Sequence, residues 1–197
     1  PTHPQAARWQ ALGWRWLNHA LQTQIDLNGA YCQHSANYHR LVLHIAVWID
    51  ALVRQQGGVW PEQSHQRLAA ATRWLLTLCD PISGHVPNLG PNDGALVLPL
   101  ASCPFADYRP PLQAAALAFL GVPAFPPGPW DEPAKWLGLD VVSNHQNFNI
   151  EVQGQDPLVL RAERGSAWAY LRAACYSSRP GHADQLHLDL WWRGMNL

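Results

Sequence analysis

Eight consecutive residues hold the densest group of chemically active side chains in this sequence. They supply two imidazoles, a phenol, two carboxamides and a guanidinium, in the order Gln33-His34-Ser35-Ala36-Asn37-Tyr38-His39-Arg40. The apolar run 41–52 that follows predicts a helix, and Ser35 is the residue type that caps helix N-termini. Tyr38 would then lie in the first turn, where the helix dipole favours a phenolate. We therefore expect the dipole to lower the pKa of Tyr38 and to prepare it for proton transfer.

Two later segments carry further motifs. Residues 88–94 read Asn-Leu-Gly-Pro-Asn-Asp-Gly, and residues 180–186 read Pro-Gly-His-Ala-Asp-Gln-Leu. Taken in this order, the three motifs resemble those of the heparinase II/III-like polysaccharide lyases, and the likeness runs along nearly the whole chain. The resemblance implies cleavage of a uronic-acid-containing polysaccharide by β-elimination, and a periplasmic or secreted location.

The resemblance places the catalytic tyrosine at Tyr38 and a catalytic histidine of the sheet domain at His182. Elimination requires a base for the C5 proton, an acid for the leaving oxygen at C4, and groups that neutralise the substrate carboxylate. We expect Tyr38 to transfer a proton and His182 to stabilise charge or to act as an acid or base. If this segment is a strand, Asp184 shares a face with His182 and orients its imidazole.

Further polar residues are candidates for binding substrate, and each also has a structural alternative, as a loop hydrogen-bonding group, a turn former or part of an ion pair. They are Gln33, His34, Asn37, Asn92, Asp93 and Arg109. On the opposite strand face, His187 and Asp189 could ligate a structural divalent metal, although a solvated face is the commoner meaning of two such residues. We expect no required cofactor.

The composition restricts the partners. A net charge of −1 and 14% charged residues argue against electrostatic capture of nucleic acid. The sequence holds no apolar run long enough for a membrane span. The cysteines are too widely spaced for a C-x-x-C zinc site. The expected partner is an acidic polysaccharide.

Periodicity predicts helices first and strands later. Apolar residues recur at helical spacing over 5–24, 36–56, 63–79 and 111–120, with a long loop over 81–110. Alternation predicts an antiparallel sheet with strands at 149–152, 158–162, 167–173 and 185–190. The expected fold is multidomain α and β. Residues 1–122 are helical, 123–136 form a Pro/Gly-rich linker, and 137–197 form the sheet. The resemblance makes the helices part of an (α/α) toroid and the sheet an incomplete β-sandwich.

The resemblance also implies that the chain continues at both ends into a longer enzyme. The family's carboxylate-binding asparagine lies upstream of the equivalent of Pro1, so these 197 residues alone are expected to be weakly active or inactive. Two other functions stay open. One is a non-catalytic carbohydrate-binding protein with the same cleft. The other is a glycoside hydrolase, which needs two facing carboxylates from among Asp93, Asp107 and Asp131.

Overall fold

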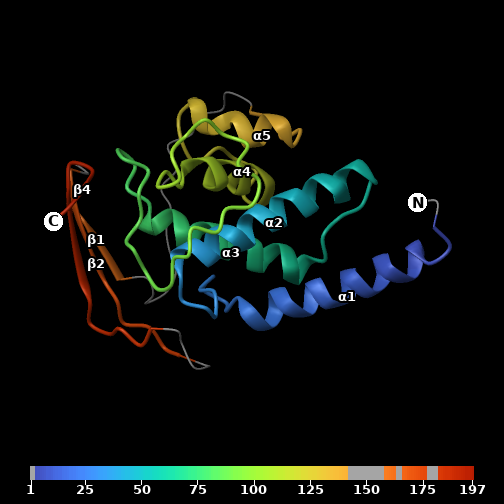
Figure 1. Cartoon of the computed structure of the whole chain (residues 1–197), viewed down its shortest axis with the longest axis horizontal. Helices are drawn as coiled ribbons and strands as arrows, with labels where there is room; N and C mark the ends of the chain where they lie inside the picture. The colour runs from blue at the N-terminus through green and yellow to red at the C-terminus, as the bar shows by residue number, and fades with distance from the viewer. Residues whose placement is uncertain (1–2, 142–157, 163–165, 177–181) are drawn as a thin grey trace.

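The computed structural model describes residues 3–141, 158–162, 166–176 and 182–197. In this part of the chain, a group of helices is followed by a sheet that stands at one end of the molecule (Figure 1). The helices are α1 (Ala6–Gln24), α2 (Ala36–Gln55), α3 (Glu62–Leu78), α4 (Arg109–Phe119) and α5 (Glu132–Trp136), the last preceded by the 3-10 turn η1 (Pro129–Asp131). The four helices predicted from periodicity are confirmed to within two residues at each end.

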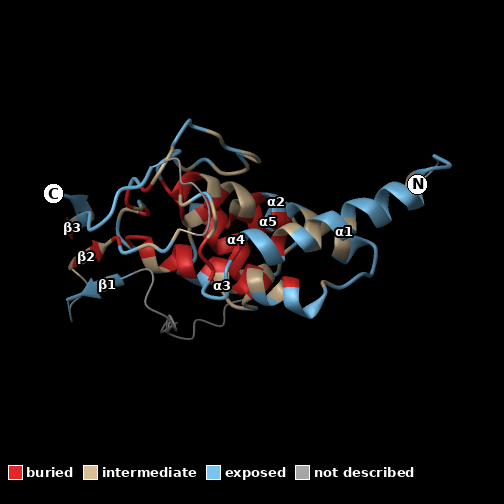
Figure 2. Cartoon of the chain, turned by 90° about the horizontal axis from the view of Figure 1, so that it is seen from below, coloured by how far each residue is buried: buried red, intermediate tan, exposed pale blue. Residues whose placement is uncertain are grey.

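The core lies where α2, α3 and α4 pack together. Each contributes an apolar stripe, and Leu43, Leu68, Leu75 and Leu112 are fully buried in it. Burying a leucine side chain contributes roughly 1.5–3 kcal/mol, so this stripe supplies much of the drive for folding. Figure 2 shows buried residues concentrated in these helices, whereas α1 is largely exposed toward its N-terminus.

Residues 123–136, which the sequence predicts as a Pro/Gly-rich linker, pack against α4. The buried Gln113 side chain of α4 accepts hydrogen bonds from the backbone N–H groups of Ala124 and Phe125, both at 2.9 Å. It also donates to the buried carboxylate of Asp131 at 2.7 Å. The side-chain amide of Gln113 therefore holds this Pro/Gly-rich segment against α4 by hydrogen bonds near the start of the segment and to Asp131.

The sheet is an antiparallel meander in the order β1-β2-β3-β4. Its strands are β1 (Leu158–Arg161), β2 (Ala167–Leu171), β3 (Leu188–Trp192) and β4 (Met195–Asn196). The structure thus confirms a mixed fold of helices and an antiparallel sheet. The predicted strand 149–152 lies outside the described residues.

The strand predicted at 185–190 is present, but its predicted start is wrong. β3 begins at Leu188, because Leu186 has a φ of 58°, a left-handed conformation that a strand does not contain. The backbone N–H of Leu186 instead donates to the carbonyl of Arg172. As a result, His182 and Asp184 precede the strand and have no strand face to share.

One buried carboxylate joins the sheet to the C-terminal end of α3. Asp80 is 1% exposed, and its Oδ1 accepts from the backbone N–H and the hydroxyl of Ser83. Its Oδ2 accepts from the indole N–H of Trp168 in β2 at 2.9 Å. Arg161 of β1 lies over the Trp168 ring and donates to the carbonyl of Thr77 at 2.6 Å. These contacts fix the position of the sheet against the helices.

We expect Asp80→Asn to reduce the free energy of unfolding by roughly 1.5–3 kcal/mol at neutral pH, because the amide loses charge-assisted acceptors in a buried position. Burial opposes ionisation of Asp80, but the hydrogen bonds from Ser83 and Trp168 outweigh it and lower its pKa. A lowered folded pKa gives stability that is present above the unfolded pKa of about 3.9 and is lost as the pH falls through the folded value.

Urea unfolding at neutral pH and below about pH 4 checks this expectation. The difference between the wild-type protein and Asp80→Asn should shrink in acid. The exposed Asp140→Asn is the matched control and should unfold like the wild type. An equal loss at both pH values would show that the ionised carboxylate is not what stabilises this joint.

Candidate functional site

The N-terminus of α2 is bonded to the loop 88–94, so two of the three sequence motifs lie side by side. Ser35 caps the helix as predicted, since its Oγ accepts from the backbone N–H of Tyr38 at 3.1 Å. The same hydroxyl donates to the carbonyl of Pro91 at 2.6 Å. The backbone N–H of Ala36 donates to the carbonyl of Leu89 at 2.9 Å. These bonds hold the loop across the first turn of α2.

Tyr38 and Asp93 form a hydrogen-bonded pair at this junction. The Tyr38 hydroxyl donates to Asp93 Oδ2 at 2.8 Å, while Oδ1 accepts from the backbone N–H of Ala95 at 3.0 Å. The bond between the two side chains raises the pKa of Tyr38 and lowers the pKa of Asp93. The prediction of a lowered pKa for Tyr38 is therefore wrong, because a facing carboxylate disfavours the phenolate more than the helix dipole favours it. At neutral pH the pair is a phenol bonded to a carboxylate.

The buried amide of Asn37 and the buried guanidinium of Arg40 continue the hydrogen bonding of this pair into the interior. Asn37 is 1% exposed, and its Nδ2 lies 3.5 Å from Asp93 Oδ1. Its Oδ1 accepts from the guanidinium of Arg40, which is also 1% exposed. Arg40 lies between the rings of Phe105 and Tyr108, at 4.1 and 4.3 Å from their centroids. This burial favours a supporting role for Asn37 over the predicted contact with substrate.

His34 connects this junction to the segment that precedes β3. Its backbone is left-handed with a φ of 49°, and a Cβ at the neighbouring Gly90 would lie 2.2 Å from its carbonyl oxygen. Its ring meets the ring of Tyr176 edge-on at 4.7 Å, and the Tyr176 hydroxyl donates to the carbonyl of Asp184 at 3.1 Å. Burial, and then the charge of Arg172, lower the pKa of His34, so its ring is neutral at pH 7.

His182 is exposed and lies in this same segment. Its carbonyl accepts from the hydroxyl of Tyr176 and from the guanidinium of Arg172, each at 3.5 Å. The third motif therefore approaches the other two through Tyr176 and His34. A direct approach of the His182 side chain to Tyr38 stays a prediction.

Asp184 faces His187, which corrects its expected pairing with His182. The Nδ1 atom of His187 lies 3.4 Å from Asp184 Oδ2, and its Nε2 lies 3.4 Å from Asp189 Oδ2. Asp189 also accepts from the amide of Asn196 at 2.7 Å. Within the described ranges, no group of three or more His, Cys, Asp or Glu side chains is arranged to hold a metal ion.

The remaining candidates occupy different settings. Gln33 is exposed beside His34, and Asn92 is exposed with its Oδ1 accepting from the backbone N–H of Gly94 at 3.2 Å. Arg109 is engaged elsewhere, because Asp107 binds it with both carboxylate oxygens at 2.9 and 2.7 Å. Its guanidinium also lies over the ring of Trp130. This geometry favours a structural role for Arg109.

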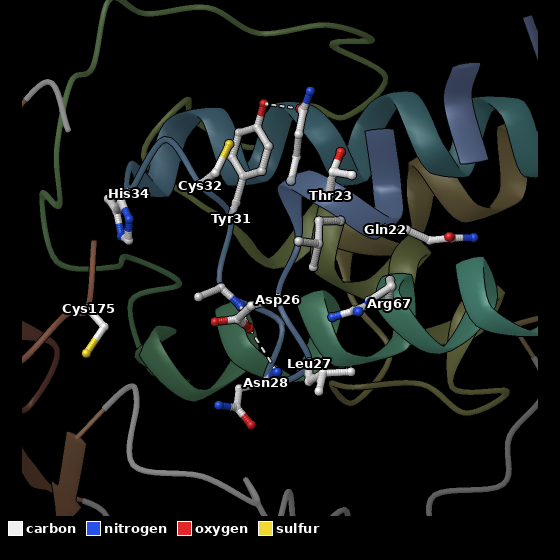
Figure 3. Close-up of a pocket in the computed structure, with 13 residues that line it drawn as sticks. Gln22, Thr23, Asp26, Leu27, Asn28, Tyr31, Cys32, His34, Arg67 and Cys175 are labelled. Carbon is white, nitrogen blue, oxygen red and sulfur yellow. Dashed lines mark hydrogen bonds between the residues drawn. The ribbon is translucent and has the colours of Figure 1, made fainter. Parts of the chain in front are cut away.

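A groove of about 450 Å³ opens beside His34 (Figure 3). Its lining includes Tyr31, Arg67 of α3 and Cys175. Sequence reasoning missed Arg67, because an arginine on the polar side of an amphipathic helix is normally solvated. Nothing in the local pattern around residue 67 distinguishes it from such a residue.

A scan of this chain against protein-family models found no match, nor did searches of curated proteins and of solved structures. Of the helices that the structure describes, none combines the length and the apolarity needed to cross a membrane.

Proposed function

We propose that this chain carries the proton-transfer site of a polysaccharide lyase, which cleaves a uronic-acid-containing polymer by β-elimination. The observation that carries the proposal is the 2.8 Å hydrogen bond between Tyr38 and Asp93 at the N-terminus of α2. Support also comes from the motifs that resemble heparinase II/III-like lyases. Two of them supply this pair, and the third supplies the His182 segment that His34 approaches through Tyr176.

The proposal extends to the fold, in which the helices are part of an (α/α) toroid and the sheet is part of a β-sandwich. The sheet packs one face on the helices through Trp168, Tyr170 and Trp191, which are buried. Its other face exposes Leu160, Leu188 and other apolar side chains. A second sheet covers such a face in a sandwich, so this exposure supports the proposed architecture.

In the proposed reaction, a base removes the proton on C5, a double bond forms between C4 and C5, and the bond from C4 to the glycosidic oxygen breaks. Tyr38 donates its proton to that leaving oxygen. Its raised pKa suits this role, because the phenol stays protonated at neutral pH. Asp93 accepts the hydrogen bond of the Tyr38 hydroxyl until the leaving oxygen of the substrate replaces it as the acceptor. His182 is the proposed base that accepts the C5 proton.

A product assay on the intact protein tests this function against a panel of uronic-acid polymers. A lyase gives new chain ends together with ultraviolet absorbance from the unsaturated sugar. A hydrolase gives new reducing ends without that absorbance. A non-catalytic carbohydrate-binding protein, the alternative that the groove beside His34 favours, binds polymer and gives neither.

Asp93→Asn should lower turnover by less than the 10²–10⁴-fold, in order of magnitude, expected for loss of the acid itself. It should also shift the basic limb of the pH–rate profile to lower pH. The hydrogen bond that Tyr38 donates to Asp93 is the largest cause of the raised pKa of Tyr38, so its removal lets the phenol ionise at lower pH. The control Asp140→Asn should leave the profile unchanged. A basic limb that does not move in Asp93→Asn would remove Tyr38 as the acid.

A further inference from the structure

We propose that the groove beside His34 is a subsite for a uronate unit of the polymer, and that Arg67 binds the carboxylate of that unit. This inference rests on the proposed function and adds the residue that selects an acidic sugar at a second position. The groove is bounded by the C-terminal end of α1, by the turn that follows it, and by α3. Arg67 extends from α3 among the side chains that line this space (Figure 3).

Arg67 is a half-buried cation without an intramolecular acceptor in the described part of the chain. Arg54 and Arg109, in contrast, are paired with Asp50 and Asp107. A guanidinium offers five N–H donors in a planar fork that matches the two oxygens of a carboxylate. A half-buried arginine that lines a groove and has no described acceptor is suited to bind an anionic ligand.

The rest of the lining fits a sugar that carries a single negative charge. Asp26 uses Oδ1 to accept from the backbone N–H groups of Asn28 and Ala30, at 2.8 and 2.9 Å. Its Oδ2 has no hydrogen-bond donor among the described residues and can accept from a sugar hydroxyl. The amides of Gln22 and Asn28 also line the groove and can bond hydroxyls in either direction. The lining therefore fits a uronate, with Arg67 for its carboxylate and the neighbouring polar groups for its hydroxyls.

His34 lies between the groove and the proposed catalytic junction. This residue lines the groove, contacts Tyr176 with its ring, and packs its backbone against Gly90 in the loop that carries Asp93. A polymer that reaches Tyr38 can therefore place a neighbouring unit beside Arg67. Since His34 is neutral at pH 7, it can bond a sugar hydroxyl there without competing for the carboxylate.

Calorimetric titration tests the subsite with uronate oligosaccharides and their carboxyl-reduced counterparts at one ionic strength. The titrations use the intact protein with Tyr38→Phe, so that ligand is not consumed. Arg67→Gln should weaken binding of the acidic oligosaccharide on the order of 10-fold or more, because it removes a charge-assisted pair. Arg67→Lys should bind with intermediate affinity. Arg73→Gln, on the exposed side of the same helix, is the matched control and should bind like its parent.

The carboxyl-reduced oligosaccharide identifies the group that Arg67 binds. It should bind the parent weakly, and Arg67→Gln should weaken it no further, because the two changes remove the same interaction. Equal affinity of the parent and Arg67→Gln for the acidic oligosaccharide would overturn the subsite. If the protein with Tyr38 present forms unsaturated product although Arg67→Gln binds like its parent, only the subsite is wrong. If the protein neither binds nor cleaves an acidic polymer, the proposed function is wrong as well.

Discussion

Tyr38→Phe should lower the turnover of the intact protein on the order of 10²–10⁴-fold while its fold is retained. The substitution removes only the hydroxyl that donates to Asp93 and keeps the aromatic ring. The proposed acid is lost, whereas the free energy of unfolding should change by no more than about 1.5 kcal/mol for one hydrogen bond. Initial rates from ultraviolet absorbance and urea unfolding curves measure the two effects separately.

A double variant sharpens this test. If Asp93 acts only through the phenol, Asp93→Asn should cost turnover in the wild-type background and almost nothing in Tyr38→Phe. Fully additive losses would show that Asp93 contributes independently of Tyr38. Turnover of Tyr38→Phe close to the wild-type value would remove the tyrosine from the reaction.

His182→Ala should also abolish most turnover, by on the order of 10²-fold or more, because it removes the group proposed to accept the C5 proton. The matched control is His187→Ala, an exposed histidine nearby that is engaged by Asp184 and Asp189. We expect its turnover to stay within a few-fold of wild type. Because Asp184 faces His187, Asp184→Asn should resemble His187→Ala. If His187→Ala lowered turnover as much as His182→Ala, the loss in His182→Ala would be due to misfolding of this segment.

The helices could be predicted from the sequence because their determinants are local. Apolar spacing marks α1 to α4, and Ser35 at the start of α2 is a cap that one residue type identifies. The start of β3 could not be predicted in the same way. Leu186 continues the alternation of the strand in sequence, but its backbone turns left-handed to bond Arg172, a residue of the preceding segment.

The components of the site could be found in the sequence, but their protonation and partners could not. Tyr38 and Asp93 are separated by 55 positions, so the bond that raises the tyrosine pKa exists only after the loop 88–94 has folded onto α2. The same applies to Asn37, whose burial depends on Arg40 and the rings around it. Local patterns identify a residue as polar, whereas tertiary packing decides whether it meets solvent, substrate or a carboxylate.

Cleavage of a uronic-acid polymer in heavy-oxygen water, followed by mass spectrometry of the products, tests the central claim most directly. Elimination takes no oxygen from water, so we predict unlabelled ends and a new non-reducing end that is lighter by one water than the hydrolysis product. Both products should disappear together in Tyr38→Phe. A new non-reducing end that is not lighter by one water, with heavy oxygen already in the new reducing end at the earliest times, would show hydrolysis. It would contradict the assignment of Tyr38 as the acid of a lyase.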